Sequence, residues 1–474
     1  MSLDLKLFQE NSIKIKITRF LFFCWLLTLP FGSNLMQLSL GYFTIYPNLV
    51  FSLILLPLAL ISLKKWSKLN YVFTGFLACW FIVEIVLGNQ INFPKEAIFD
   101  LRSLLMQSIF AVILIGVYAV IGISEFRKNL IIGLRCFLFI LVVSGVLEFL
   151  TGIHFSGTKT AEMLSLPVGN TFYAPMFIYD NQNDYLTYFL FALFLLCLFD
   201  EKLRNNSWLR LIFACLGFLF SVYADSTFAK WICEALILFG MVEIVFLKRK
   251  YISFRTLSPY LIVGTFMILT ILNNPLFLGP KFKNGANYRL NTISVVENKG
   301  EKLMVKPAKE ALSDKQQVQV ISYLDSVNTK SPTGATNLRK NLILNGIDFI
   351  KEKPFLGLGP GGYSLKCKEK EVRHFVNSHT SAHNFPIEVI SEFGVFGWLY
   401  FVFLLFILVQ LFKKREVIDF RLRNSILYFV IALPLLWMMP SAFLYLNIHW
   451  LFLPLLIILN ESIQDNLNPD GVKQ

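Results

Sequence analysis

Long, uninterrupted apolar runs recur from one end of this chain to the other, and they restrict its possible folds more than any other feature. Two of them are Phe51 to Leu63 and Leu186 to Phe199. A helix of roughly 20 apolar residues crosses the ~30 Å hydrocarbon core of a bilayer. A transmembrane β-barrel would instead show short segments of alternating hydrophobicity. Only 16% of the residues are charged, fewer than in a typical soluble protein. We therefore predict an all-α polytopic membrane protein.

Hydropathy predicts a bundle of about twelve transmembrane helices. The chain then divides into an N-terminal transmembrane bundle (1–273), a large extracytoplasmic loop (274–391), and C-terminal transmembrane helices with a cytoplasmic tail (392–474). The large loop falls between the ninth and tenth spans. The predicted spans are approximately 17–33, 43–63, 70–88, 102–123, 130–150, 184–199, 208–224, 227–247, 256–273, 392–412, 424–439 and 443–460.

The distribution of basic residues orients this bundle. The short loops on one side of the predicted bundle are rich in Lys and Arg, whereas the short loops on the other side hold little beyond Lys95 and Lys159. Loops rich in Lys and Arg face the cytoplasm. Both termini are then cytoplasmic, and segment 274–391 lies outside. The net charge of +13 is explained largely by this topology, so it does not indicate a nucleic-acid partner. The residues on the inner side include Lys14, Lys16, Arg19, Lys64, Lys65, Lys68, Arg127, Lys128, Lys202, Arg204, Lys413 and Lys414.

The large external segment has two halves of different character. Its first half, Lys281 to Ser331, is polar and irregular in sequence, and we assign it no regular structure. In its second half, apolar residues recur near helical spacing from a cap at Thr336 or Asn337. The pair Lys353-Pro354 ends that predicted helix. The whole segment has more Lys and Arg than Asp and Glu, and its length exempts it from the topology rule.

His383 is the first candidate catalytic residue. It stands just before an apolar helix, Phe385 to Leu411, in which Pro386 suits the first turn. The positive end of a helix favours a neutral imidazole, which can act as a base. The alternative is a structural or capping histidine. His379 lies four residues earlier, but a zinc site would need a third ligand that the sequence does not supply, and no cysteine pair suggests one. We expect no metal and no cofactor.

Arg339, on the predicted external helix, is the second candidate. A guanidinium binds phosphate oxygens with a planar fork, so Arg339 suits an anionic substrate. The alternative is a solvated helix charge. The turn that follows contains Gly357 and Gly359, whose N–H groups could bind an anion. The turn has no Gly-Lys-Ser/Thr sequence, and it could equally be a tight turn that needs positive φ angles.

Three further ionisable residues lie at predicted membrane edges. Glu392 lies four residues after Glu388 on one helix face, and an ionisable group at that depth is a functional candidate by default. Its alternative role is to pair with a cation on another span. Lys230 and Arg102 lie near outer ends of spans, where each could face a lipid-linked phosphate or could snorkel to the surface.

Together these segments resemble the O-antigen ligase and polymerase superfamily, which includes teichuronic acid biosynthesis members. The resemblance rests on the asparagine-rich start of a span at Tyr179 to Tyr185, and on Arg339 leading into Pro354 to Tyr363. It rests also on His383-Asn384 followed by Glu392 to Gly397, and on one large external loop late in the bundle. Members commonly carry Ser-Arg where this chain has Ser226-Thr227. Lys230 supplies a cation one turn later, but as a point charge and not as a fork.

The resemblance implies a metal-independent glycosyl transfer on the outer face of a bacterial plasma membrane, in the assembly of a surface polysaccharide such as capsule or cell-wall glycan. The donor would be a glycan on undecaprenyl diphosphate, and the acceptor a glycan or a lipid. Arg339, Lys230 and Arg102 would hold the diphosphate, and His383 would deprotonate or orient the acceptor hydroxyl. Further substrate contacts would come from Asn183, Ser226, Asn384, Glu392, Gly357 and Gly359.

A polysaccharide or glycolipid transporter or flippase is the alternative from another class, because about twelve spans suit it. Transporters usually consist of two related halves with broken helices near the midplane. Here the halves differ in sequence, and the large loop is placed asymmetrically. A structural or sensor protein would not need His383, Arg339 and Lys230 to converge. The residues do not distinguish a polymerase from a ligase.

Overall fold

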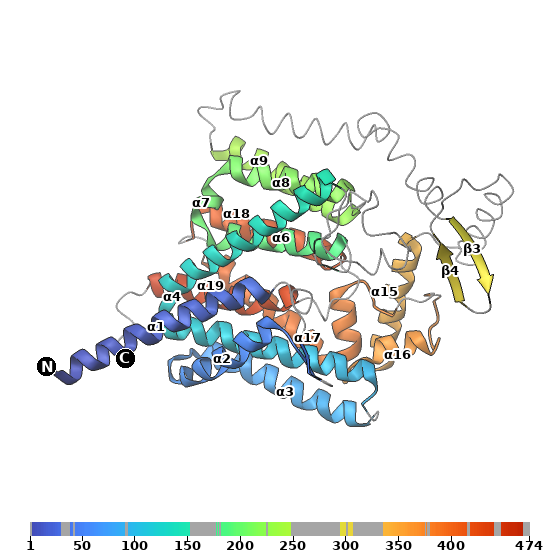
Figure 1. Cartoon of the computed structure of the whole chain (residues 1–474), viewed down its shortest axis with the longest axis horizontal. Helices are drawn as coiled ribbons and strands as arrows, with labels where there is room; N and C mark the ends of the chain where they lie inside the picture. The colour runs from blue at the N-terminus through green and yellow to red at the C-terminus, as the bar shows by residue number, and fades with distance from the viewer. Residues whose placement is uncertain are drawn as a thin grey trace. The chain divides into compact units, whose positions relative to one another are not determined.

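Helices make up most of the part of the chain that the structure, a computed structural model, describes (Figure 1). This part comprises residues 2–29, 38–40, 43–90, 93–151, 177, 179, 182–223, 226–247, 294–299, 302–306, 335–374, 376, 380–414, 418–439 and 447–467. The predicted helical class is therefore confirmed.

Helices occur from the beginning of the described part of the chain to its end. In chain order they are α1 (Ser2–Thr28), α2 (Pro47–Ile61), the 3-10 turn η2 (Leu63–Lys65), α3 (Lys68–Gln90), α4 (Lys95–Thr151), α6 (Gln182–Phe199), α7 (Glu201–Asn205), α8 (Ser207–Tyr223), α9 (Thr227–Leu247), α15 (Ala335–Glu352), α16 (Gly362–Lys368), α17 (Phe385–Lys413), α18 (Phe420–Leu436) and α19 (Asn447–Leu467).

Two short antiparallel ribbons depart from the all-α prediction. Strand β1 (Leu38–Leu40) pairs with β2 (Phe43–Ile45), and β3 (Ser294–Lys299) pairs with β4 (Lys302–Lys306). The second ribbon lies inside Lys281 to Ser331, to which we assigned no regular structure. Its Val295, Val296 and Val305 have β-branched side chains that favour strands. The polar composition around them hid this local signal.

A helix covers most of each predicted span, apart from 256–273, which lies outside the described residues. Three helical stretches are long and apolar enough to cross a membrane: Lys68–Gln90, Lys95–Glu148 and Phe385–Lys413. Shorter apolar stretches occur in α2, α6, α8 and α19. These helices identify an integral membrane protein. The count of twelve spans and the outward position of the large loop stay predictions.

Helix α4 contains two of the predicted spans. Its backbone breaks at Gly122, where φ is 78° and ψ is 165°. Residues with a side chain rarely adopt this conformation, so glycine permits the change of direction. Arg127 and Lys128, which we predicted in a loop between the two spans, lie instead in the helix that resumes after Gly122.

The chain forms two compact units, each of which is described by itself. The first unit comprises Met1–Ile140, Thr187–Asn206 and Asn341–Gln474, and the second comprises Leu141–Leu186 and Ser207–Lys340. In the first unit, α2 and α4 approach so closely that a Cβ atom on Gly116 would lie 2.2 Å from the Cβ of Ala59. In the second unit, α8 and α9 pack side by side, as their green ribbons show in Figure 1.

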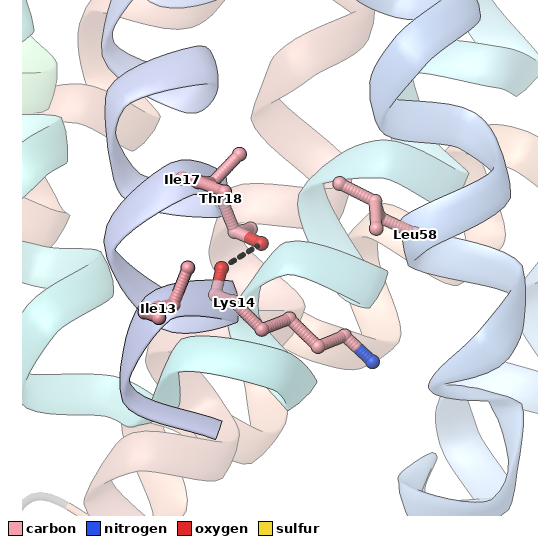
Figure 2. A pocket seen from close by; sticks show the side chains of 5 residues that line it. All are labelled: Ile13, Lys14, Ile17, Thr18 and Leu58. Carbon is pink, nitrogen blue, oxygen red and sulfur yellow. Dashed lines mark hydrogen bonds between the residues drawn. The ribbon is translucent and has the colours of Figure 1, made fainter. Parts of the chain in front are cut away.

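A shallow apolar cavity of about 290 Å³ lies between α1 and α2 in the first unit (Figure 2). Ile13, Lys14, Ile17, Thr18 and Leu58 line it. The Thr18 hydroxyl donates a hydrogen bond to the Lys14 carbonyl at 2.9 Å within α1. Apart from Thr18 and Lys14, the lining of the cavity is aliphatic. The cavity therefore does not have the polar groups of a reaction site.

Candidate active site

His383 lies in a constrained turn immediately before α17. Its φ angle of 49° is in the left-handed region, which is unfavourable for a residue with a side chain. Asn384 caps the helix, as its side chain accepts a hydrogen bond from the Ile387 N–H at 3.1 Å. The Phe385 N–H donates to the Trp437 carbonyl at 3.1 Å. The predicted helix start after His383-Asn384, with proline in its first turn, is therefore confirmed.

Ser381 joins the histidine turn to the helix that follows. Its hydroxyl donates to the Glu388 carboxyl group, with 2.7 Å between Oγ and Oε2, and accepts the His383 N–H at 3.4 Å. Glu388 is buried one turn into α17. This chain of two hydrogen bonds ties the unusual backbone of His383 to a buried side chain. Ser381 was not among the predicted site residues, because the sequence gives no signal there beyond its nearness to His383.

The glycine turn packs against a break in α17. Gly394 has φ 52° and ψ −123°, and this break releases two carbonyl groups of the preceding turn. The Leu358 N–H donates to the Ser391 carbonyl, and the Gly359 N–H donates to the Glu392 carbonyl, both at 2.9 Å. The Gly357 N–H donates to the Lys353 carbonyl at 3.0 Å. Carbonyl groups of the chain thus occupy these N–H groups. Gly357 and Gly359 have positive φ angles of 70° and 84°, as the interpretation of a tight turn requires.

Glu392 belongs to a group of buried carboxyl residues in the first unit. It is 2% exposed and accepts the Tyr363 N–H at 3.3 Å. Its carboxyl group also faces Asp100 of α4 and Glu388. Among the described residues, no basic side chain forms an ion pair with Glu392. Asp100 was not among the predicted site residues. The sequence does give a signal for it, because it is an acidic residue within an apolar run.

Arg339 lies on the first turns of α15, in the second unit. Its guanidinium carbon lies over the ring of Phe228, a residue of α9, at 5.5 Å from the ring centre. The residue is half-buried, and this burial lowers the pKa of its guanidinium. Within the described part of the chain, no acidic residue forms an ion pair with it. The neighbouring Lys340 is exposed.

The start of α9 carries two more of the predicted residues, close to Phe228. Ser226 is buried, and its carbonyl accepts the Lys230 N–H at 3.1 Å. Lys230 is half-buried and interacts electrostatically with Glu234. The second unit thus brings Arg339 to the helix turn that carries Ser226 and Lys230. Asn183 lies half-buried in the first turn of α6, and no described contact joins it to Arg339.

Arg102 has a different environment in the first unit. Its Nη2 atom donates to the Tyr46 hydroxyl at 2.9 Å, and its guanidinium carbon lies 5.3 Å from the centre of the same ring. The side chain is otherwise exposed at the start of α4. The first unit also contains His383, Asn384 and Glu392. His379, proposed as a companion of His383, lies outside the described residues.

Comparison with known proteins identifies one family. Residues 185–402 match the family described as O-antigen ligase. This match begins in α6 and ends in α17, so it contains Arg339, Lys230 and His383. A search of curated proteins gives no significant match.

Proposed function

We propose that this chain, whose residues 185–402 match the O-antigen ligase family, transfers a glycan from a polyprenyl diphosphate to a glycan or lipid acceptor outside the cytoplasm. The observation that carries this proposal is Arg339, a half-buried guanidinium with no ion-pair partner among the described residues. Burying a charge is costly unless it is paired. We infer that the diphosphate of the donor supplies the missing anion.

The leaving group is stabilised by cationic side chains, without a metal ion. Arg339 holds the diphosphate through its fork of N–H donors, and Lys230, from the neighbouring start of α9, adds a point charge. Arg102 uses one N–H on Tyr46 and has further donors for a phosphate near the start of α4. As the bond between the sugar C1 and the phosphate oxygen breaks, these cations offset the charge that develops on that oxygen.

His383 serves as the base for the acceptor. Its imidazole removes the proton of the attacking hydroxyl as the new bond between that oxygen and C1 forms. The proton then passes to water, and the polyprenyl diphosphate leaves. In this proposal His383 acts on the acceptor, and Arg339 acts on the diphosphate of the donor. A flippase would need the donor's phosphate contacts but no base.

Glycan analysis in cells tests this proposal. A deletion strain is complemented with His383→Ala or Arg339→Ala, and Lys340→Ala serves as the matched control because Lys340 is exposed beside Arg339. We expect both site variants to lose surface polymer and the control to keep it. Single lipid-linked repeat units would identify a polymerase, and full-length unattached polymer would identify a ligase. Normal polymer length and attachment in both site variants would refute the assignment.

A further inference from the structure

A second pocket, of about 450 Å³, lies along the C-terminal half of α15 in the unit that holds His383. None of its residues has a role in the steps proposed above. Its volume is within the range of small-ligand sites, roughly 300–1,000 Å³. The lining consists of Asn345, Asp348, Phe349, Lys351, Glu352, Glu371 and Arg373.

The wall of this pocket is fixed by a pair of hydrogen bonds. The fully buried Asn345 amide donates to the His374 carbonyl at 2.8 Å and accepts the His374 N–H at 2.9 Å. This clamp holds the segment that carries Glu371 and Arg373 against α15. Phe349 forms the apolar floor and packs edge-on against Tyr363, with ring centres 5.4 Å apart. The pocket is therefore built by the protein before any ligand binds.

The polar groups of the pocket include both signs of charge. Asp348, Glu352 and Glu371 can accept hydrogen bonds, whereas Lys351 and Arg373 can donate them. Several of these charges already have partners. An Arg373 nitrogen lies 3.9 Å from an Asp348 oxygen, and Glu352 pairs with Lys366 outside the lining at 2.6 Å. The pocket therefore does not need an ion to balance its charge.

The charges that line the pocket suit the sugar part of the proposed substrate and not its diphosphate. The lining holds three carboxylates and two cations. Because the carboxylates outnumber the cations, the pocket is unsuited to the anionic end of the donor. A sugar hydroxyl both donates and accepts hydrogen bonds, and it can use carboxylates and cations in turn. We propose that this pocket binds an uncharged sugar residue of the glycan substrate. The proposal rests on the proposed glycosyl transfer and gives that reaction a glycan subsite apart from the phosphate site.

Saturation-transfer NMR tests this subsite on the purified full-length protein in detergent. The probes are the methyl glycosides of a neutral hexose and of an N-acetylhexosamine, with inorganic pyrophosphate as competitor. We expect at least one glycoside to receive saturation, and pyrophosphate not to displace it. The variant D348A/R373A should bind that glycoside at least about tenfold more weakly, because hydrogen bonds to charged groups are lost. Lys353→Ala, exposed and outside the lining, should bind it normally.

The single variant Arg373→Ala shows whether an effect of the double variant comes from loss of folding. The Arg373 side chain is 82% exposed, so its removal should leave the fold intact. It too should weaken glycoside binding. The subsite is refuted if neither glycoside binds, if pyrophosphate displaces it, or if both pocket variants bind it as the wild type does. Absent glycoside binding together with loss of polymer in H383A and R339A would refute the subsite alone. Glycoside binding that depends on Asp348 and Arg373, with normal polymer in H383A and R339A, would refute only the proposed reaction.

Discussion

At the scale of single residues, the proposed reaction depends on His383 and Arg339 and on the contacts that hold them. His383 and Arg339 stand out by residue type and by position beside predicted helix ends. Ser381 does not, because its importance comes from two hydrogen bonds that exist only once His383 adopts a left-handed backbone. Phe228, under Arg339, lies in a distant part of the chain. Tertiary contacts of this kind have no local signature in the sequence.

The Ser381 link makes a prediction about catalysis. Ser381→Ala removes both hydrogen bonds and leaves the His383 turn to relax, so the imidazole should spend less time aligned with the acceptor hydroxyl. Removing one partner of a buried hydrogen bond costs about 1–3 kcal/mol. We therefore expect kcat for glycan transfer to fall by about tenfold or more, with KM for the donor little changed.

Two variants serve as comparisons in the same kinetic assay. Glu388→Gln keeps an oxygen that can accept the Ser381 hydroxyl proton, so it should lose less activity than Ser381→Ala. Ser364→Ala, on α16, should retain normal kinetics. A rise in KM with unchanged kcat for Ser381→Ala would argue against a positioning role.

At the scale of elements, hydropathy and capping patterns predicted where helices lie but not where they break. The N-cap of α17 at Asn384 and the end of α15 before Lys353 agree with the sequence signals. The break at Gly394 does not show in hydropathy, because the apolar run continues through it. It exists because the glycine turn supplies partners, including the Phe355 carbonyl, which accepts the Val395 N–H at 2.8 Å.

Gly394→Ala should therefore destabilise the protein. A Cβ atom at this position would lie 2.3 Å from the Phe355 carbonyl oxygen, and the φ angle of 52° disfavours any side chain. Backbone strain alone costs about 1–3 kcal/mol. We expect a clearly lower thermal unfolding midpoint for the purified protein in detergent.

Gly75→Ala is the matched control for this prediction. A Cβ atom on Gly75, inside α3, meets nothing within 4 Å, and alanine is favoured over glycine in a helix by about 0.5–1 kcal/mol. Its midpoint should stay equal or rise. Equal midpoints for Gly394→Ala and the wild type would show that the break is not needed.

At the scale of the whole molecule, the bilayer explains why so much was predictable. Lipid forces the backbone to satisfy its hydrogen bonds within each segment, so long apolar runs become helices. Which charged groups meet depends instead on how those helices pack, and hydropathy does not contain that information. Arg339 and the start of α9 come together within one compact unit. That His383 acts in the same transfer step as Arg339 is the central claim of the proposed function.

A double-mutant cycle on the transfer step tests that claim most directly. The rate constant for transfer at saturating lipid-linked donor is measured for the purified wild type, for His383→Ala, for Arg339→Ala and for the double variant. We expect each single variant to lose at least about a hundredfold. Groups that act in one step are strongly non-additive, so the double variant should be about as slow as the slower single variant. Losses that multiply in the double variant, or single variants with normal rates, would contradict the joint action of His383 and Arg339 in the transfer step.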